Sequence, residues 1–112
     1  MRTKITVVGI GPGDASDMTV RAVEVIRGSR VLVGYSYYLS LIIPLAREDV
    51  EIVGTGMRQE AERIDIAFDI ALSGRDVTVI SSGDANIYGM APLVMQKLRE
   101  RNASDCIEVE IV

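Results

Sequence analysis

Residues 4–14 read KITVVGIGPGD, an apolar run that stops at a loop with glycine at every second position. The run over residues 5–8 is rich in β-branched residues and is closed by Gly9, as is typical of a strand. It does not alternate apolar and polar residues, which favours burial on both faces, as in a parallel sheet. The three glycines then allow an irregular turn in which a ligand can approach the bare backbone. This stretch predicts a strand that ends at a loop of an α/β protein.

Five segments have the composition of buried strands, and helical segments lie between them. Strands are expected at residues 5–8, 31–33, 51–53, 77–80 and 107–112. Helices are expected from a cap at Asp17 or Thr19 to Gly28, over 37–45 ending at or before Pro44, over 60–73, and over about 87–101. This alternation predicts an α/β fold, a parallel five-stranded sheet with helices on both faces.

The two longer helices have distinct apolar faces. In residues 60–73 the apolar positions repeat at intervals of three and four, and Arg63 falls off that face. These positions are Ala61, Ile64, Ala67, Phe68, Ala71 and Leu72. In residues 87–101 the inward stripe is Met90, Leu93, Val94 and Leu98. Pro92 fits that helix only in or near its first turn, because proline has no backbone N–H to donate.

The composition excludes several classes of protein. With 112 residues the chain suits one domain, and its 48% apolar residues exceed what a disordered chain carries. Twelve basic against sixteen acidic residues give a net charge of −4, which argues against a nucleic-acid binder. One Cys and no His exclude an internal disulfide and argue against a metal site of the zinc type.

No targeting or membrane segment is expected. The longest apolar stretch, residues 37–46, is about half as long as a spanning helix, and Pro44 interrupts it. The N-terminus carries no signal-peptide pattern. We therefore expect a cytoplasmic protein.

The first glycine loop, residues 9–14, does not match the common phosphate-binding patterns. A dinucleotide fingerprint would place its third glycine at position 14, where Asp14 stands and would repel a pyrophosphate. Pro12 removes one backbone N–H from any anion nest, and no Gly-Lys-Ser/Thr follows. The loop suits a neutral or cationic ligand, and a turn without a ligand is the alternative.

The second loop, residues 81–86, reads SSGDAN and also follows a predicted strand. Asp84 or Asn86 can cap the next helix, which is the structural interpretation. The carboxyl ends of parallel strands meet at one edge of a sheet, where ligands bind in open α/β folds. Two such loops together predict a cleft in which Asp14 and Asp84 bind ribose hydroxyls, an ammonium or a sulfonium.

Four segments of the chain resemble the tetrapyrrole methylase family: residues 7–14, 33–39, 54–60 and 80–91. The glycine loop alone marks the superfamily, and the other three are similar to the branch that methylates precorrin-3B at C-17. The resemblance covers essentially the whole chain. Family members have two α/β domains with S-adenosylmethionine between them, which implies that residues 1–112 are the N-terminal domain and that the second domain is absent from this chain.

The resemblance also implies which residues form the site. Contacts to S-adenosylmethionine are implied at Pro12, Ser82, Gly83, Asp84 and Ile87. Contacts to the tetrapyrrole are implied at Gly9, Gly11, Gly13, Asp14, Tyr35 and Arg58, with Tyr37 and Tyr38 beside them. Arg47 and Arg63 are weaker candidates than Arg58 for the carboxylates of the substrate. No catalytic acid or base is assigned, because Tyr35 and Thr55 stand where relatives carry an acid and a Lys. No metal ligand is assigned, because the chain has no His and no pair of Cys.

The implied activity is methylation of precorrin-3B, or its cobalt form, at C-17 with ring contraction, in cobalamin biosynthesis. The implied partners are the tetrapyrrole and a second copy in a homodimer, with no nucleic acid and no membrane, and the fragment is expected to be inactive alone. Two alternatives stay open: another precorrin methyltransferase or related tetrapyrrole methylase, and a stand-alone nucleotide-binding or interaction domain without catalysis.

Overall fold

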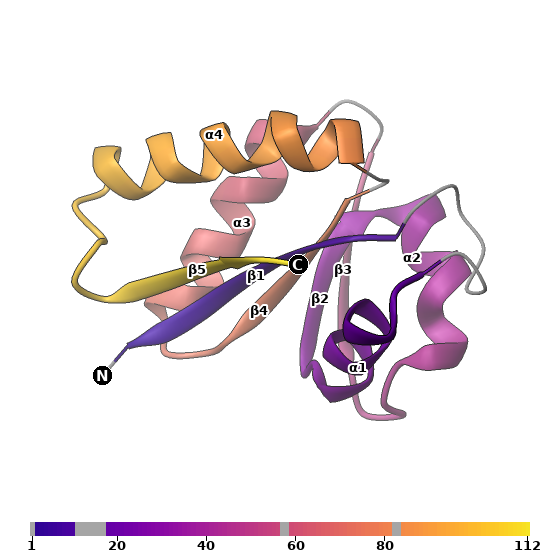
Figure 1. Cartoon of the computed structure of the whole chain (residues 1–112). Helices are drawn as coiled ribbons and strands as arrows, with labels where there is room; N and C mark the ends of the chain where they lie inside the picture. Colours follow the sequence, from indigo (N-terminus) through magenta and orange to yellow (C-terminus); the bar gives the residue numbers. More distant parts are fainter. Residues whose placement is uncertain (1, 11–17, 57–58, 82–83) are drawn as a thin grey trace.

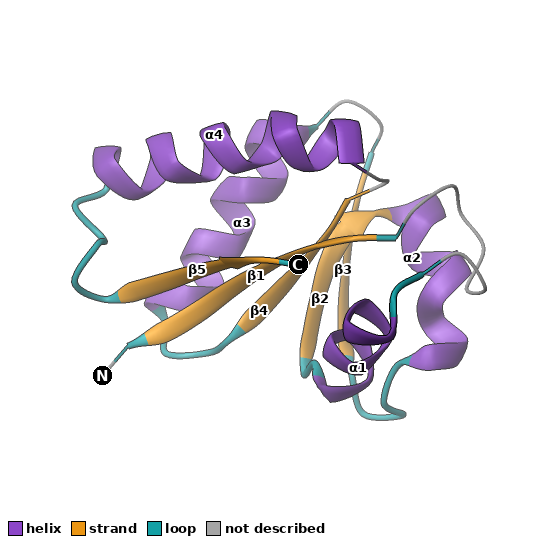
Figure 2. Ribbon diagram, in the orientation of Figure 1, coloured by secondary structure: helices purple, strands orange, loops and turns teal. Residues whose placement is uncertain are grey.

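The computed structural model describes residues 2–10, 18–56, 59–81 and 84–112, with the backbone alone over 84–91. Five strands alternate with four helices and a short 3₁₀ turn, η2 (Figures 1 and 2). In chain order they are β1 (Thr3–Gly9), α1 (Val20–Gly28), β2 (Val31–Tyr35), α2 (Ser36–Ile42), η2 (Ile43–Leu45), β3 (Glu51–Thr55), α3 (Glu60–Leu72), β4 (Val77–Ser81), α4 (Asp84–Glu100) and β5 (Ile107–Ile111).

The strands form one parallel sheet in the order β3-β2-β4-β1-β5. Helices α1 and α2 cover one face, and α3 and α4 cover the other (Figure 1). The chain runs through β1, β2 and β3 with its helices on one face, and then returns through β4 and β5 with its helices on the other. The predicted fold class is confirmed.

Each face of the sheet has its own apolar core. Beneath α3 and α4, strand residues such as Val7 and Val79 surround Phe68, which is fully buried. Beneath α1 and α2, Val8 and Ile80 pack against Ile26 and the residues around it. Because neighbouring strand residues point to opposite faces, the unbroken apolar runs of the sequence fill both cores.

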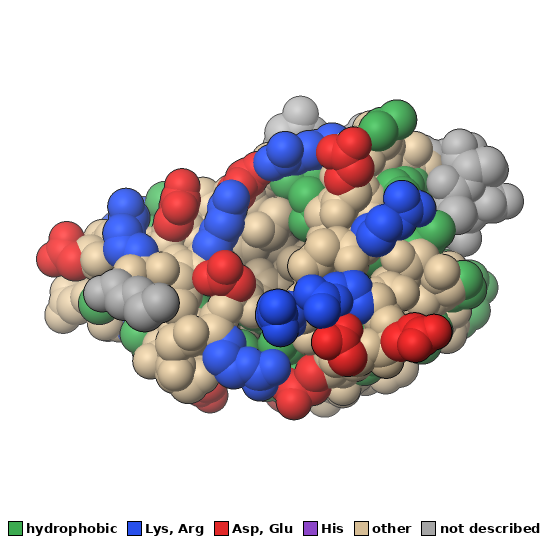
Figure 3. Space-filling view, turned by 90° about the horizontal axis from the view of Figure 1, so that it is seen from below, with side chains coloured by type: hydrophobic (Ala, Val, Ile, Leu, Met, Phe, Trp, Pro, Cys, Tyr) green, Lys and Arg blue, Asp and Glu red, His purple; other side chains and the backbone are tan. Residues whose placement is uncertain are grey.

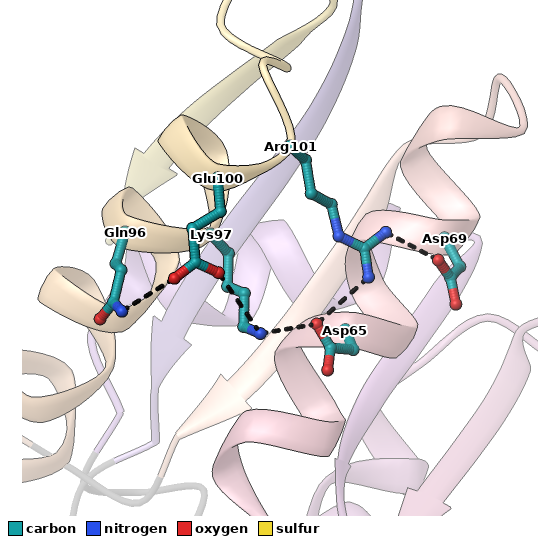
Figure 4. Close-up of polar contacts among 6 residues, drawn as sticks. All are labelled: Asp65, Asp69, Gln96, Lys97, Glu100 and Arg101. Atoms are coloured by element: carbon teal, nitrogen blue, oxygen red, sulfur yellow. Dashed lines mark hydrogen bonds and ion pairs between the residues drawn. The ribbon is translucent and has the colours of Figure 1, made fainter.

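Helices α3 and α4 are joined by an ion-pair network (Figure 4). Asp65 accepts from Lys97 Nζ and from Arg101 Nη2, each at 3.2 Å, and Asp69 accepts from Arg101 Nη1 at 2.8 Å. The hydrogen bond to Asp69 is the main reason that the pKa of Arg101 is raised above its usual range. The guanidinium of Arg101 also lies 5.7 Å from the centroid of the Phe68 ring. The network fixes the relative position of the two helices over one core.

The position of Pro92 differs from the expectation. Helix α4 begins at Asp84, so Pro92 lies inside the helix and not in its first turn. Proline removes one helical hydrogen bond there. Val94 and Leu98 are buried in the core with residues of the sheet and of α3, and this packing offsets the lost hydrogen bond. Helix propensity does not include such tertiary contacts, so the sequence alone did not predict this position of Pro92.

Helix α3 also departs from its predicted face. Ile64, Ala67, Phe68 and Ala71 are buried as expected, whereas Ala61 and Leu72 are exposed and Arg63 is buried. Ala61 and Leu72 lie in the first and last turns of α3, at the two ends of its buried stretch. Arg63 instead points to the polar end of β3, where its guanidinium has hydrogen-bond acceptors.

No helix among the residues that the structure describes is both long enough and apolar enough to cross a membrane.

Candidate functional site

The five parallel strands all end at one side of the sheet. We call this side the carboxyl edge and define it by Gly9, Tyr35, Thr55 and Ser81, the last residues of β1, β2, β3 and β4. Gly9 of β1 lies opposite Ser81 of β4, and Tyr35 of β2 lies opposite Thr55 of β3. After β1 the chain passes to α1 on one face, and after β4 it passes to α4 on the opposite face (Figure 1). Adjacent strands whose connections part in this way leave a crevice between them, the usual ligand site of open α/β sheets.

The structure places part of the predicted site at this edge. Gly9 and Tyr35 end β1 and β2, and Asp84 and Ile87 lie in the first turn of α4, directly beyond β4. Outside the described residues are the remaining predicted positions: Gly11, Pro12, Gly13, Asp14, Arg58, Ser82 and Gly83. The two strand ends that carry the glycine loops are therefore neighbours, as the sequence predicted.

Ser81 is a candidate site residue that the sequence analysis did not single out. Its side chain is 2% exposed, and its Oγ has no hydrogen-bond partner among the described residues. Its carbonyl accepts a 2.9 Å hydrogen bond from the amide of Ile10, which holds β1 and β4 together one residue beyond Gly9. A buried hydroxyl without a partner is costly, so Ser81 is suited to binding a polar group at this edge.

Three tyrosines form a cluster at the end of β2. The rings of Tyr35 and Tyr38 meet edge to face with centroids 5.1 Å apart, and Tyr37 lies 6.2 Å from Tyr35 and 6.0 Å from Tyr38. Tyr37 is 58% exposed, so the cluster presents an aromatic surface to solvent beside the carboxyl edge. Such a surface is suited to contact with a flat, conjugated ligand.

Arg63 is buried at the end of β3, contrary to its prediction as a residue off the apolar face. Its guanidinium donates from Nε to Thr55 Oγ1 at 2.9 Å and from Nη2 to the carbonyl of Gly56 at 3.2 Å. Burial lowers the pKa of Arg63, and the nearby Glu60 and Tyr38 oppose that change. Helical periodicity could not reveal this position, because its partners lie on a neighbouring strand and turn.

Arg47 is not brought to the carboxyl edge. It lies in the connection before β3, at the opposite end of that strand, and pairs with Asp49 at 2.9 Å. Three arginines were candidates for binding the carboxylates of the substrate. Arg63 lies near the carboxyl edge, Arg47 lies at the opposite end of the sheet, and Arg58 lies outside the described residues.

A polar groove of about 580 Å³ opens at the other end of the sheet, beside α1. Its charged lining residues are Arg2, Lys4, Arg21, Glu24, Arg30, Arg75, Asp76 and Glu110. Basic and acidic side chains alternate over this side of the molecule (Figure 3). Lys4 and Arg21 both pair with Glu110, and Arg75 pairs with Glu51. Three of the five basic residues of the lining thus have carboxylate partners. The groove is therefore mainly a network of surface ion pairs, and the candidate site stays at the carboxyl edge.

The charge of Glu110 makes this network sensitive to acid. Hydrogen bonds from Lys4 and Arg21 hold the pKa of Glu110 below its usual value of 4.5. A carboxylate whose pKa is lower in the folded state stabilises the fold above its unfolded pKa, and this contribution is lost as the pH falls through the folded pKa.

We expect Glu110→Gln to lower the melting temperature slightly at pH 7 and to have no effect at a pH below both pKa values. Glu108→Gln, on the same strand and without an ion pair among the described residues, is the control. Equal losses for both variants at pH 7 would contradict this account.

Comparison with known proteins matches both the fold and the segments quoted above. The family model described as Tetrapyrrole (Corrin/Porphyrin) Methylases matches residues 4–112. The chain is 38% identical over 108 residues to the probable cobalt-factor III C(17)-methyltransferase of Salmonella typhimurium, covering 96% of this chain and 44% of that protein. It is 40% identical over 114 residues to the cobalt-factor III methyltransferase of Priestia megaterium, covering 100% and 21%.

A solved structure agrees with these relatives. The crystal structure of the methyltransferase CobJ matches with a TM-score of 0.83 and 31% identity, covering 97% of this chain and 45% of that one. The chain spans less than half the length of each of these three proteins.

Proposed function

Because the chain belongs to the tetrapyrrole (corrin/porphyrin) methylases, we propose that it is the N-terminal half of a methyltransferase of cobalamin biosynthesis. The observation that carries the proposal is the 38% identity, over nearly the whole chain, to a relative named as a cobalt-factor III C(17)-methyltransferase. The parallel sheet with neighbouring β1 and β4 ends supports it, because that arrangement provides a ligand crevice.

The proposed cosubstrate is S-adenosylmethionine, bound beyond the ends of β1 and β4. The donor and acceptor groups there suit it: the bare backbone at Gly9, and the buried hydroxyl of Ser81, which has no partner among the described residues. Pro12, Ser82, Gly83, Asp84 and Ile87 complete the proposed contacts. When bound, S-adenosylmethionine supplies a methyl group on a positively charged sulfur. The acidic residues Asp14 and Asp84 suit that charge better than they would suit a pyrophosphate.

The proposed substrate is precorrin-3B or its cobalt form, methylated at C-17 with ring contraction. The names of the two curated relatives favour the cobalt form. We place the macrocycle over the glycine loop and the tyrosine cluster, in contact with Gly9, Gly11, Gly13, Asp14, Tyr35 and Arg58. The exposed ring of Tyr37 supports that placement, since an aromatic surface beside the edge can stack on a conjugated ring system.

In the proposed reaction, a carbon of the macrocycle attacks the methyl carbon in line with the methyl–sulfur bond. The electron pair of that bond remains on sulfur, which leaves as the neutral thioether. Such a transfer depends on alignment and on the exclusion of water more than on a strong acid or base. The chain's own residues would hold the two reactants at adjacent strand ends, and no catalytic acid or base is proposed.

A second α/β domain, absent from this chain, is part of the proposal, with the cosubstrate between the two domains. A homodimer and a cytoplasmic location are proposed from the same family resemblance. The share of the relatives that this chain spans, 44% in the first case, supports a missing half. We expect the fragment to be inactive on its own.

Methyl transfer by the full-length protein tests the proposal. The protein is incubated with methyl-labelled S-adenosylmethionine and either cobalt-factor III or precorrin-3B. We expect label at C-17 of one of them, with one thioether released per methyl group. Label on an earlier or later precorrin would assign another methyltransferase of the family. No transfer to any tetrapyrrole, with binding of NAD, would favour the nucleotide-binding alternative and overturn the proposal.

A further inference from the structure

We propose that Arg63 is a positioning residue that joins the ends of β2 and β3 to the turn before α3 and so holds the tetrapyrrole side of the site. The inference rests on the proposed function, and it goes beyond it by assigning a role to a buried side chain of α3. Arg63 is 5% exposed, and its guanidinium donates to two consecutive residues, the last residue of β3 and the first residue after it.

The contacts form a relay from α3 to the two strands. Arg63 Nε donates to Thr55 Oγ1 at 2.9 Å, and Thr55 Oγ1 donates in turn to the carbonyl of Gly34 at 3.2 Å. Gly34 immediately precedes Tyr35, which lies opposite Thr55 in the sheet. The guanidinium is therefore connected through one hydroxyl to the backbone that carries Tyr35.

The same guanidinium also holds the first residue after β3. Arg63 Nη2 donates to the carbonyl of Gly56 at 3.2 Å, while the amide of Gly56 donates to the side chain of Gln59. The backbone N–H and C=O of Gly56 are thus both hydrogen-bonded to side chains at the start of α3. Ser36 Oγ adds a 3.3 Å hydrogen bond to the carbonyl of Thr55. Three side chains, those of Ser36, Gln59 and Arg63, thus form hydrogen bonds with Thr55 and Gly56 at the end of β3.

A purely structural residue at this place would not need a charge. Burying a guanidinium is costly unless its donors are used, so the position favours a residue with several fixed, coplanar donors. Lysine has one nitrogen and cannot reach two acceptors in this planar arrangement. The geometry therefore indicates that the direction of the strand ends, and not the filling of space, is what Arg63 provides.

A positioning role of Arg63 can be distinguished from a general effect on stability, because the two ligands are proposed to contact different strand ends. The proposed cosubstrate contacts follow β1 and β4, whereas Tyr35 ends β2 and the turn at Gly56 follows β3. Loss of the relay should misplace the tetrapyrrole and leave the cosubstrate crevice intact. We expect a higher KM for the tetrapyrrole, with nearly unchanged affinity for S-adenosylhomocysteine.

The test uses the full-length protein with Thr55→Val, Thr55→Ser and Arg63→Lys. Thr55→Val keeps the shape and removes the hydroxyl, so we expect the tetrapyrrole KM to rise by about tenfold or more. Thr55→Ser keeps the hydroxyl and should stay close to wild type. Arg63→Lys should resemble Thr55→Val, because it keeps the charge and loses the paired donors. Arg75→Lys, an exposed arginine at the other end of the sheet, is the matched control.

A second measurement keeps the test decisive if a variant unfolds. In Arg63→Ala, added guanidinium ion at a concentration that leaves wild type unaffected should lower the tetrapyrrole KM again, and should have no such effect in Arg75→Ala. An equal rise in both the tetrapyrrole KM and the S-adenosylhomocysteine Kd, or Thr55→Val matching wild type, would overturn the inference. Failure of the proposed function would look different, since wild type itself would then transfer no methyl group.

Discussion

Replacing Phe68 by alanine is expected to lower the free energy of unfolding by about 3–5 kcal/mol, the range typical of a large aromatic side chain removed from a core. Phe68 is fully buried and is the largest fully buried side chain among the described residues. It lies in the core beneath α3 and α4, where strand residues from both halves of the sheet converge. Its removal would leave a cavity and would also take away the ring that lies beside the Arg101 guanidinium.

Urea unfolding at pH 7, followed by circular dichroism, measures this effect. Phe68→Leu keeps most of the volume and should lose about 1.5 kcal/mol or less. Leu72→Ala, on the same helix and 49% exposed, should change stability by about 0.5 kcal/mol or less. A loss for Phe68→Ala no larger than that for Leu72→Ala would contradict the described core.

Replacing Gly34 by valine is expected to destabilise the protein by about 1–3 kcal/mol through overpacking. A Cβ atom on Gly34 would lie 3.1 Å from Ile80 Cβ, so Ile80 on β4 would have to shift, and it would lie in van der Waals contact with Leu39 Cδ2 at 3.5 Å. The two further carbons of valine then have little room between this strand and helix. The strain would fall on the strand whose end carries Tyr35. We therefore expect the tetrapyrrole KM of the full-length protein to rise as well.

Gly28→Ala is the matched control for this prediction. No atom lies within 4 Å of a Cβ built on Gly28, which is exposed at the end of α1. That change should be neutral or slightly stabilising, because alanine has the higher helix propensity. Equal stability of Gly34→Val and Gly28→Ala would show that β2 and β4 are not packed as described.

Much of the fold was predictable because it depends on local patterns. The five apolar runs predicted the five strands to within two residues at either end. Thr19 caps α1 through its side chain, as its residue type predicted. The alternation of strands and helices then left a parallel sheet as the arrangement that buries every run.

The parts that could not be predicted depend on contacts between distant segments. Pro92 lies inside α4 because the packing of Val94 and Leu98 outweighs one lost hydrogen bond. Arg63 is buried because Thr55 and Gly56 offer acceptors, which a helical wheel cannot register. The Ser81 hydroxyl is buried without a partner in the part of the chain that the structure describes, and only the three-dimensional structure reveals this.

The candidate site was predictable to a similar extent. The two glycine loops pointed to one edge, and the pairing of Gly9 with Ser81 confirms that their strands are neighbours. The role of each loop residue toward a ligand stays a prediction. Arg47 was a wrong candidate, because charge and sequence proximity do not reveal at which end of a strand a residue lies.

The central claim is that the cosubstrate binds at the carboxyl edge, between the ends of β1 and β4. An amide NMR titration with S-adenosylhomocysteine, with NAD as the parallel control, tests it most directly on the full-length protein. We expect shifts centred on Gly9, Ile10 and Ser81 with S-adenosylhomocysteine alone. Shifts confined to the polar groove around Lys4 and Thr78, shifts at Gly9 with NAD alone, or no shifts at saturating S-adenosylhomocysteine would each contradict the claim.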